Sequence, residues 1–454
     1  MKSMRLLLVW LIAACLSGCQ FYPFAPAASP GAKEESAAGR TVIRVWGGTS
    51  PEEGFRQVIE QFNAQYRDRG IRAVYEQYAS GDRTANLKLE TSLLSGGNDI
   101  DVYLSYTTQA LSKRVSANIA LDLSALIERD GFDMEKNFSG DVKKLYFDDK
   151  PYSVPSTIGK MGIIVNKDLF DAAGIAVPTE WTYEEFRNIA KRLTSGAEED
   201  KVYGVFWNTQ ANISEALLHL VLPTLGGDPL YRNGGRESNL DDPVIAQALE
   251  LLRTTMLEDL SAPTHVESVT RKLSMDGVFT GGKAAMTVGA WMYGSLLGET
   301  GHPHRFVAAF APWPVVEKGR RQYTQGSFGG HLSINPNSPH IDAAWEFVKW
   351  YSTSGCKLLI PYGFTPSYTG FSQEEVASEL IRYADGKADA DSAIALFLNP
   401  DSNLSIPLIS RRINELTTVF DDAVEAVLTE KRTTEQALSE AKKKGDRLLR
   451  ESRK

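Results

Sequence analysis

Residues 41–46 read TVIRVW, a β-branched run that stops at the turn residues Gly47 and Gly48. Apolar residues then recur at helical spacing through 52–66, which predicts a strand followed by an amphipathic helix. The alternation continues with an expected strand at 71–78, a helix at 86–94, a strand at 101–104 and a helix at 110–117. This order favours an α/β fold with a mostly parallel sheet and right-handed crossovers.

Three loops follow the carboxyl ends of these predicted strands, at 46–50, 78–82 and 105–109. In open α/β sheets, ligands bind beyond these ends of the strands. The pattern therefore predicts that this edge of the first sheet carries part of a binding site.

A second α/β unit begins with the predicted strand at 162–166. Its helices are expected at 182–193, 214–222 and 243–257, and its further strands at 202–206, 284–288 and 306–310. The end of the chain, 414–449, is predicted to be helical and highly charged. The folded part, 41–454, is long enough for two domains of ordinary size.

The start of the chain has the layout of a secretory signal peptide. Two cationic residues precede an apolar run at 6–16, which is shorter than the roughly 20 residues of a membrane helix. The small residues Ser17 and Gly18 then stand before Cys19. We expect residues 1–18 to be removed as a signal peptide.

This arrangement resembles the lipobox of bacterial lipoproteins, in which the cysteine receives a diacylglycerol and the new amino terminus is acylated. The resemblance implies that Cys19 is lipidated, and 19–40, rich in Ala, Pro, Ser and Gly, is typical of a flexible linker. An ordinary signal peptide with an incidental cysteine is the alternative. A lipid anchor predicts a location on the extracellular face of the cell membrane. It favours a Gram-positive bacterium, where no outer membrane retains soluble exported proteins.

The composition limits the classes of binding partner and the number of cysteines available for a disulfide. The formal net charge is −8 at pH 7, and an acidic surface argues against nucleic acid or an anionic headgroup layer as partner. Cys15 lies in the predicted leader and Cys19 is expected to be lipidated, which leaves Cys356 alone. We therefore predict no intrachain disulfide, since a core of this size needs no such support.

Three sequence blocks carry a family resemblance that spans nearly the whole mature chain. They are YSVP at 152–155 with IVNKDLF at 164–170 and PTEWTYEEF at 178–186, then FTGGKAAM at 279–286 with GAW at 289–291, and AAWEFVKW at 343–350. In this order and spacing they resemble the extracellular solute-binding proteins of sugar-type ABC importers, the family that includes maltose-binding protein.

The resemblance implies a two-lobed periplasmic-binding-protein type II fold, with a hinge and an interlobe cleft that closes on a sugar. We expect the first lobe to comprise 41–156 and about 320–371, and the second 157–319 and about 372–454. The blocks themselves are expected to be structural: Trp181, Phe186 and Trp345 in the core, and Thr182 with Glu185 as a helix cap.

A sugar site needs aromatic faces against the C–H patches of the ring and planar polar groups at the hydroxyls. Loop positions after the predicted strands supply both kinds of side chain, although each aromatic could instead lie at the edge of the core. The candidates are Trp46, Thr49, Ser50, Tyr106, Thr108, Trp207, Asn208, Gln210, Trp291 and Tyr293.

The resemblance adds further candidates and one difference. It implies that Trp291 stacks on the sugar, that the Gly-rich segment with Gly326 and Ser327 passes close to the ligand, and that Phe364 lies in an aromatic region of the site. From its sequence alone the Gly-rich segment could equally form a β-bulge. Ser156, before the second lobe, is expected to serve both hinge and ligand. The segments around residues 207 and 106 depart from the family pattern, so we expect a different sugar.

The sequence motifs of several enzyme classes are incomplete or missing in this chain. The segment 277–283 is close to a phosphate-binding loop, but Ala284 stands where Ser or Thr must hold magnesium. His302 and His304 lie apart from any metal-ligand cluster, and the serine-hydrolase and zinc-protease motifs are absent. We predict no catalytic residues, no cofactor and no metal.

The function expected from these features is that of a monomeric, lipid-anchored substrate-binding receptor of an ABC importer. It would capture a sugar or oligosaccharide between its lobes and deliver it to the transmembrane subunits of the permease. Two alternatives stay open: a binding protein for a non-sugar solute such as a polyamine or phosphate ester, and a surface lipoprotein that hydrolyses glycosides or esters.

Overall fold

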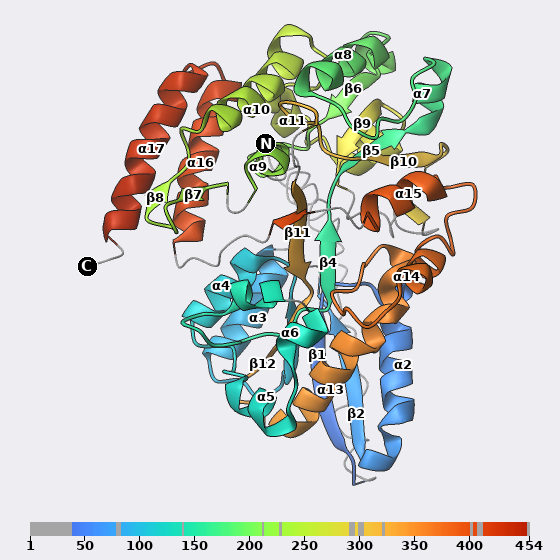
Figure 1. Ribbon diagram of the computed structural model, residues 1–454, viewed down its shortest axis with the longest axis vertical. Coiled ribbons are helices and arrows are strands. Elements are labelled where there is room, and N and C mark those ends of the chain that lie inside the picture. Colours follow the sequence, from blue (N-terminus) through green and yellow to red (C-terminus); the bar gives the residue numbers. More distant parts are fainter. Residues whose placement is uncertain are drawn as a thin grey trace, which may run out of the picture. The chain divides into compact units, whose positions relative to one another are not determined.

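Two separate four-stranded sheets organise the chain from residue 41 onward (Figure 1). The computed structural model describes residues 39–78, 83–138, 140–210, 213–226, 229–289, 296–297, 304–319, 323–399, 403–405 and 412–451. Residues 41–454 form one compact unit, and each sheet has its own hydrophobic cores.

The first sheet has the strand order β12-β3-β1-β2. Strand β1 (Thr41–Gly47) pairs in parallel with β2 (Ile71–Gln77) and β3 (Val102–Ser105), and β12 (His331–Ile334) runs antiparallel to β3. The predicted mostly parallel sheet is confirmed. Its carboxyl edge, here called the first edge, consists of the ends of β1, β2 and β3 and the start of β12.

Helices cover both faces of the first sheet. They are α2 (Phe55–Gln65), α3 (Arg83–Leu94), α4 (Thr108–Ser116), α5 (Ser124–Asp130), α6 (Met134–Phe138) and α13 (Ile341–Thr353). Because side chains alternate along a strand, Val45 packs with α2 and α13 while Trp46 packs with α3 on the other face. The predicted core position of Trp345 on α13 is confirmed.

The second sheet has the order β10-β5-β9-β6. Strand β5 (Ile163–Asn166) runs antiparallel to both β10 (Ala308–Ala311) and β9 (Ala284–Val288), and β6 (Tyr203–Phe206) is parallel to β9. The ends of β6, β9 and β10 therefore meet the start of β5 at one edge, here called the second edge.

Helices pack on both faces of the second sheet and extend beyond it. They are α7 (Lys167–Ala172), α8 (Tyr183–Leu193), α9 (Glu215–Leu225), α10 (Pro243–Arg253), α11 (His265–Thr270), α14 (Gln373–Leu380), α15 (Ala390–Phe397), α16 (Ile413–Leu428) and α17 (Thr434–Glu451). A short hairpin of β7 (Tyr231–Arg232) and β8 (Glu237–Ser238) adds to this part. The predicted helical end is two helices, because Thr429 ends α16.

The cap predicted for α8 is present in full. Glu185 N–H donates to Thr182 Oγ1, and the Glu185 carboxylate accepts the Thr182 N–H at 2.7 Å. Trp181 and Phe186 flank this cap and are buried, with ring centroids 5.0 Å apart. The structure therefore confirms that this block of the sequence is structural.

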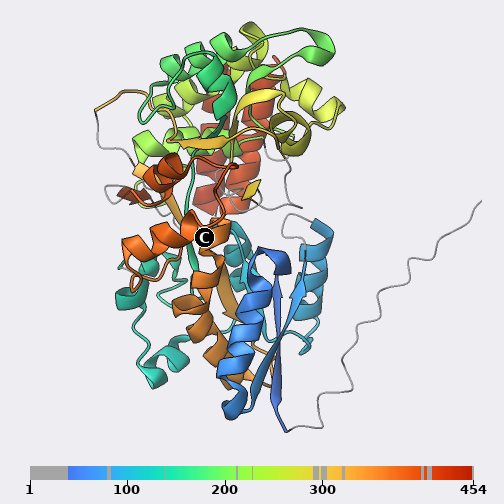
Figure 2. The same cartoon turned by 90° about the vertical axis from the view of Figure 1, so that its right-hand side faces the viewer.

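Two crossing strands connect the sheets (Figures 1 and 2). Strand β4 (Thr157–Lys160) leads toward β5, and β11 (Tyr323–Gly329) leads back to β12; the two pair in antiparallel fashion. A third strand, β13 (Asn403–Ser405), pairs in parallel with β11. The sequence pattern did not predict β4 as a strand.

No helix in the described part of the chain is long and apolar enough to cross a membrane. Cys356 is a buried free thiol, and burial raises its pKa to about 12, so it stays protonated at neutral pH. The predicted leader, Cys19 and the linker up to residue 38 lie outside the described residues.

Candidate functional site

The hydroxyl of Tyr106, which follows β3, holds the loop that follows β1. It lies 2.8 Å from the backbone nitrogen of Gly48, 3.0 Å from that of Thr49 and 3.0 Å from Thr49 Oγ1. Burial raises the pKa of Tyr106 to about 12, so the phenol keeps its proton. Since the two N–H groups occupy both lone pairs of the oxygen, the phenol proton is directed to Thr49 Oγ1.

A second tyrosine fixes the same loop from the neighbouring strand. Tyr75 on β2 donates its hydroxyl to the Thr49 carbonyl at 2.7 Å. Gly47 ends β1 so close by that a Cβ there would lie 2.8 Å from the Tyr75 hydroxyl oxygen and 3.1 Å from that of Tyr106. The predicted site residues Thr49 and Tyr106 are thus in contact, and the Tyr106 hydroxyl is saturated, which leaves its half-buried ring as the part able to face a ligand.

The other predicted site residues at the first edge differ in their exposure and in their contacts. Trp46 is 5% exposed and packs under α3, with the Lys88 ammonium 5.2 Å from its ring centre. Ser50 caps the short turn after β1 and donates to the Glu52 carboxylate at 2.7 Å. Thr108 is buried at the start of α4. Of these three, Ser50 has the more accessible side chain.

Ser156 lies at the meeting point of the connections between the lobes. Its hydroxyl donates to the Gly330 carbonyl at 2.9 Å, and its carbonyl accepts the N–H of Ser367 at 3.2 Å. The side chain is 0% exposed. Ser156 therefore ties the connections between the sheets together, and its expected roles at the hinge and toward a ligand stay predictions.

At the second edge, Trp207 is a core residue. It is 2% exposed, packs against Phe186 and donates its indole N–H to Thr255 Oγ1 at 2.9 Å. The chain turns inward after β6, so the Trp207 ring lies in the core of this structure, and its expected contact with a ligand stays a prediction. Asn208, at φ +50°, and the exposed Gln210 follow it at the surface of the edge.

The structure describes only some of the remaining predicted site residues. Trp291 and Tyr293 lie outside the described residues. Gly326 and Ser327 are in β11, where their backbones pair with Lys160 and Gly159 of β4. Phe364 follows the left-handed Gly363 and is half-buried against the core of the first lobe. Their roles toward a ligand stay predictions.

The structure adds residues that the sequence pattern did not point to. Ser214, immediately before α9, donates its hydroxyl to Asp421 Oδ1 on α16, although the two are 207 residues apart. One turn earlier on α16, Thr417 Oγ1 lies 3.4 Å from Nε2 of Gln109 on α4. The helix α16 thus links the residues after β6 with the residues after β3, and no local pattern predicts such a link.

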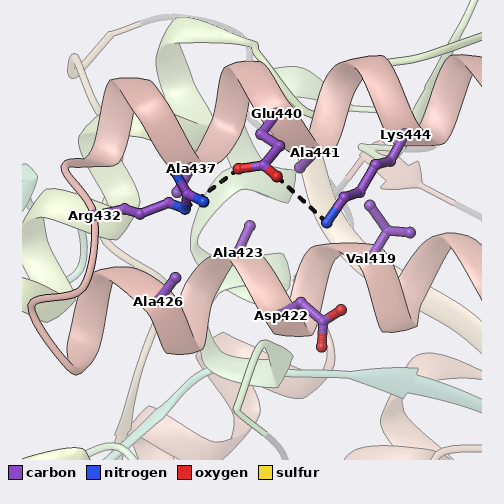
Figure 3. A pocket seen from close by; sticks show the side chains of 9 residues that line it. All are labelled: Val419, Asp422, Ala423, Ala426, Arg432, Ala437, Glu440, Ala441 and Lys444. Carbon is purple, nitrogen blue, oxygen red and sulfur yellow. Dashed lines mark ion pairs between the residues drawn. The ribbon is translucent and has the colours of Figure 1, made fainter.

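A groove between α16 and α17 is a different feature (Figure 3). Its volume is about 120 Å³, and it is lined by alanines with ion pairs from Glu440 to Arg432 and to Lys444. Ligand pockets usually have about 300–1,000 Å³, so this groove is too small for an oligosaccharide. The described residues also contain no group of three or more His, Cys, Asp or Glu able to hold a metal ion.

Comparisons with known proteins agree with this architecture. The chain is 26% identical to the diacetylchitobiose binding protein of Streptomyces coelicolor, over 69% of each chain. It is 21% identical to the arabinooligosaccharide-binding protein of Bacillus subtilis, over 97% of this chain and 98% of the relative.

Among solved structures, the ABC substrate-binding protein of Listeria monocytogenes in complex with cycloalternan superposes with a TM-score of 0.74. It is 20% identical, and the match covers 90% of this chain and 99% of that protein. The likeness shows the two-lobed binding-protein fold. Residues 48–355 match the family described as bacterial extracellular solute-binding protein. The chain belongs to this family.

Proposed function

We propose that this protein is the substrate-binding receptor of an ABC importer and that its ligand is a sugar or oligosaccharide. The observation that carries the proposal is the family match, together with relatives named for diacetylchitobiose and for arabinooligosaccharides. Family members are binding proteins rather than enzymes. A polyamine or phosphate-ester receptor and a surface glycosidase become outcomes of the test.

The proposed mechanism is a shift of population between an open and a closed arrangement of the lobes. A sugar that contacts both lobes stabilises the closed form, and the transmembrane subunits of the importer recognise that form. The lobes are proposed to comprise 41–156 with about 320–371, and 157–319 with about 372–454. The positions of β4 and β11 between the two sheets support this division.

The proposed ligand surface combines the first edge with the second. Tyr106 offers its ring, Ser50, Asn208 and Gln210 offer polar groups, and Trp291 is the proposed stacking residue. Sugars need this combination of aromatic faces and neutral or charged planar acceptors.

A thermal-shift screen of residues 40–454 tests the ligand class. We expect at least one of maltotriose, arabinotriose and diacetylchitobiose to raise the melting temperature, because a ligand that binds only the native state stabilises it. Stabilisation by spermidine or glucose 1-phosphate with none by any sugar would overturn the sugar proposal. Release of shorter sugars during the incubation would instead favour the glycosidase.

We propose in addition that Cys19 carries the lipid that keeps this monomeric receptor at the extracellular face of the membrane. In a Gram-positive cell, which has no outer membrane, this anchor would retain it. Expression of the full chain in such a cell tests the anchor: we expect the wild type in the membrane fraction and Cys19→Ser in the medium. An unchanged membrane fraction for Cys19→Ser would contradict it.

A further inference from the structure

One face of α16 carries a row of polar side chains that begins near the first lobe. Thr417, at one end of the row, lies against Gln109 of α4, with 3.4 Å between Oγ1 and Nε2. Residues four apart lie on the same side of a helix, so Asp421 follows Thr417 on this face. The row therefore runs from the contact with α4 toward the residues that precede α9.

Ser214, which directly precedes α9, holds Asp421 in place. The Ser214 hydroxyl donates to Asp421 Oδ1, and Ser214 itself is 0% exposed in the segment between β6 and α9. Burial raises the pKa of Asp421, and the neighbouring charge of Asp422 acts in the same direction, whereas the bond from Ser214 favours the ionised form. The carboxylate is half-buried, so it is fixed in position and still accessible.

We propose that Asp421 is a sugar-binding residue of the second lobe and that it selects neutral sugars over acidic ones. The inference rests on the proposed sugar-receptor function and deepens it. Among the described residues, Ser214 is the hydrogen-bond donor to Asp421 and bonds one oxygen, Oδ1. The other oxygen, Oδ2, accepts a sugar hydroxyl, as charged acceptors form the stronger hydrogen bonds.

The proposed preference for neutral over acidic sugars follows from the negative charge of Asp421. A neutral sugar supplies only hydroxyl donors, which match a carboxylate acceptor. A uronic acid in the same position would bring a second carboxylate beside Asp421, and like charges in a partly desolvated site repel one another. The sequence pattern alone does not decide whether the sugar carries an acid group, and the placement of Asp421 argues for a neutral one.

Calorimetric titrations of Asp421→Asn test the proposal, with Asp422→Asn as the matched control. Asp422 is the next residue on the same helix, is exposed, and lines the groove toward α17 (Figure 3). The probe is the sugar that gives the largest thermal shift with the wild type. We expect Asp421→Asn to weaken its binding about 10- to 100-fold, the range for a lost charged hydrogen bond, and Asp422→Asn to stay within twofold.

Selectivity is measured with a matched pair, galactobiose and digalacturonate. We expect the wild type to prefer galactobiose and Asp421→Asn to narrow that preference, an effect that a purely structural role would not produce. Circular dichroism checks the fold of each variant. If Asp421→Asn does not fold, Ser214→Ala replaces it, with an expected several-fold loss of affinity because the carboxylate is no longer held.

The outcomes separate the inference from the function on which it rests. Sugar binding by Asp421→Asn within twofold of the wild type, or a wild type that prefers digalacturonate, overturns the role of Asp421 and leaves the receptor function standing. Stabilisation of the wild type by spermidine with none by any sugar overturns both.

Discussion

At the scale of single residues, the Tyr106 hydroxyl makes the sharpest prediction. Tyr106→Phe leaves the N–H groups of Gly48 and Thr49 without their acceptor, and unsatisfied polar groups cost about 1–3 kcal/mol. We expect that loss in the free energy of unfolding, measured with urea. We also expect faster amide exchange at these two residues and weaker sugar binding.

Tyr78→Phe is the control for this variant. It also removes a buried hydroxyl, which donates to the Leu104 carbonyl at 2.6 Å, but it leaves the Tyr106 hydroxyl with its partners at Gly48 and Thr49. Equal exchange rates at Gly48 in the two variants would show that Tyr106 does not hold the loop.

The buried side chain of His331 is expected to make the stability of the protein depend on pH. It is 0% exposed at the start of β12, and burial lowers its pKa to about 4, whereas an unfolded histidine titrates near 6.5. Between these values the unfolded state binds more protons, so stability falls as the pH falls from about 6.5 to 4. The shift corresponds to a loss on the order of 3 kcal/mol.

Unfolding in urea at pH 4–7.5 measures this loss. We expect His331→Gln to flatten the pH dependence, and His340→Gln, which leaves the buried His331 in place, to retain it. Parallel curves for the wild type and His331→Gln would contradict the assignment.

Core residues were predictable one at a time where their own helix gave the pattern. Trp181 and Phe186 are buried as their spacing predicted. Trp207 follows a strand, where the next residue can turn inward or outward, and the partner that draws it inward, Thr255, is 48 residues away. The sequence therefore predicts an aromatic residue at the edge, but not the direction of its side chain.

At the scale of elements, the long helices and buried strands were predictable because their apolar periodicity is local. The cap of α8 was predictable for the same reason, since Thr182 and Glu185 are three residues apart. Strand β4 was not, because its TIGK sequence has no strong strand signal and its partner β11 lies far along the chain. Pairing with that partner makes it a strand.

Gly330, between β11 and β12, is expected to respond strongly to an added side chain. This residue has φ +54°, and a Cβ there would overlap Ser156 Oγ. We expect Gly330→Ala to lower the free energy of unfolding by about 2–4 kcal/mol, from the left-handed backbone and from the overlap. Gly319→Ala is the matched control: φ is +75° with no atom within 4 Å, so about 1 kcal/mol is expected.

A double variant isolates the overlap. In the Ser156→Ala background the obstructing oxygen is gone, and Gly330→Ala should then cost about 1 kcal/mol, like the Gly319 control. The same cost for Gly330→Ala in both backgrounds would show that Ser156 does not restrict the side chain at position 330.

At the scale of the whole molecule, the two sheets have separate cores, so the proposed closure of the lobes depends on the connections and contacts between them. The family resemblance implied two lobes, but the contacts that join them were beyond local patterns. Gln109 and Thr417, which join the proposed lobes, are 308 residues apart, and Ser214 and Asp421, which lie in the same proposed lobe, are 207 apart. Such pairs become visible only when the chain has folded.

The contact between Gln109 and Thr417 is expected to favour the closed arrangement of the proposed lobes by a measurable amount. Opening the lobes would break this hydrogen bond, so it stabilises the arrangement in which the two helices meet. A single hydrogen bond contributes about 0.5–1.5 kcal/mol, and this one is long, at 3.4 Å. We therefore expect Thr417→Val to weaken sugar binding about two- to fivefold, measured by calorimetry, and to raise the radius of gyration of the ligand-free protein in X-ray scattering.

Thr418→Val is the control, because the Thr418 hydroxyl donates within its own helix to the Asn414 carbonyl at 3.0 Å. It should leave both measurements unchanged. In a Gln109→Ala background Thr417→Val should have no further effect, since the partner is already gone. A full effect in that background would mean that Thr417 acts on the sugar directly and not on the closure of the lobes.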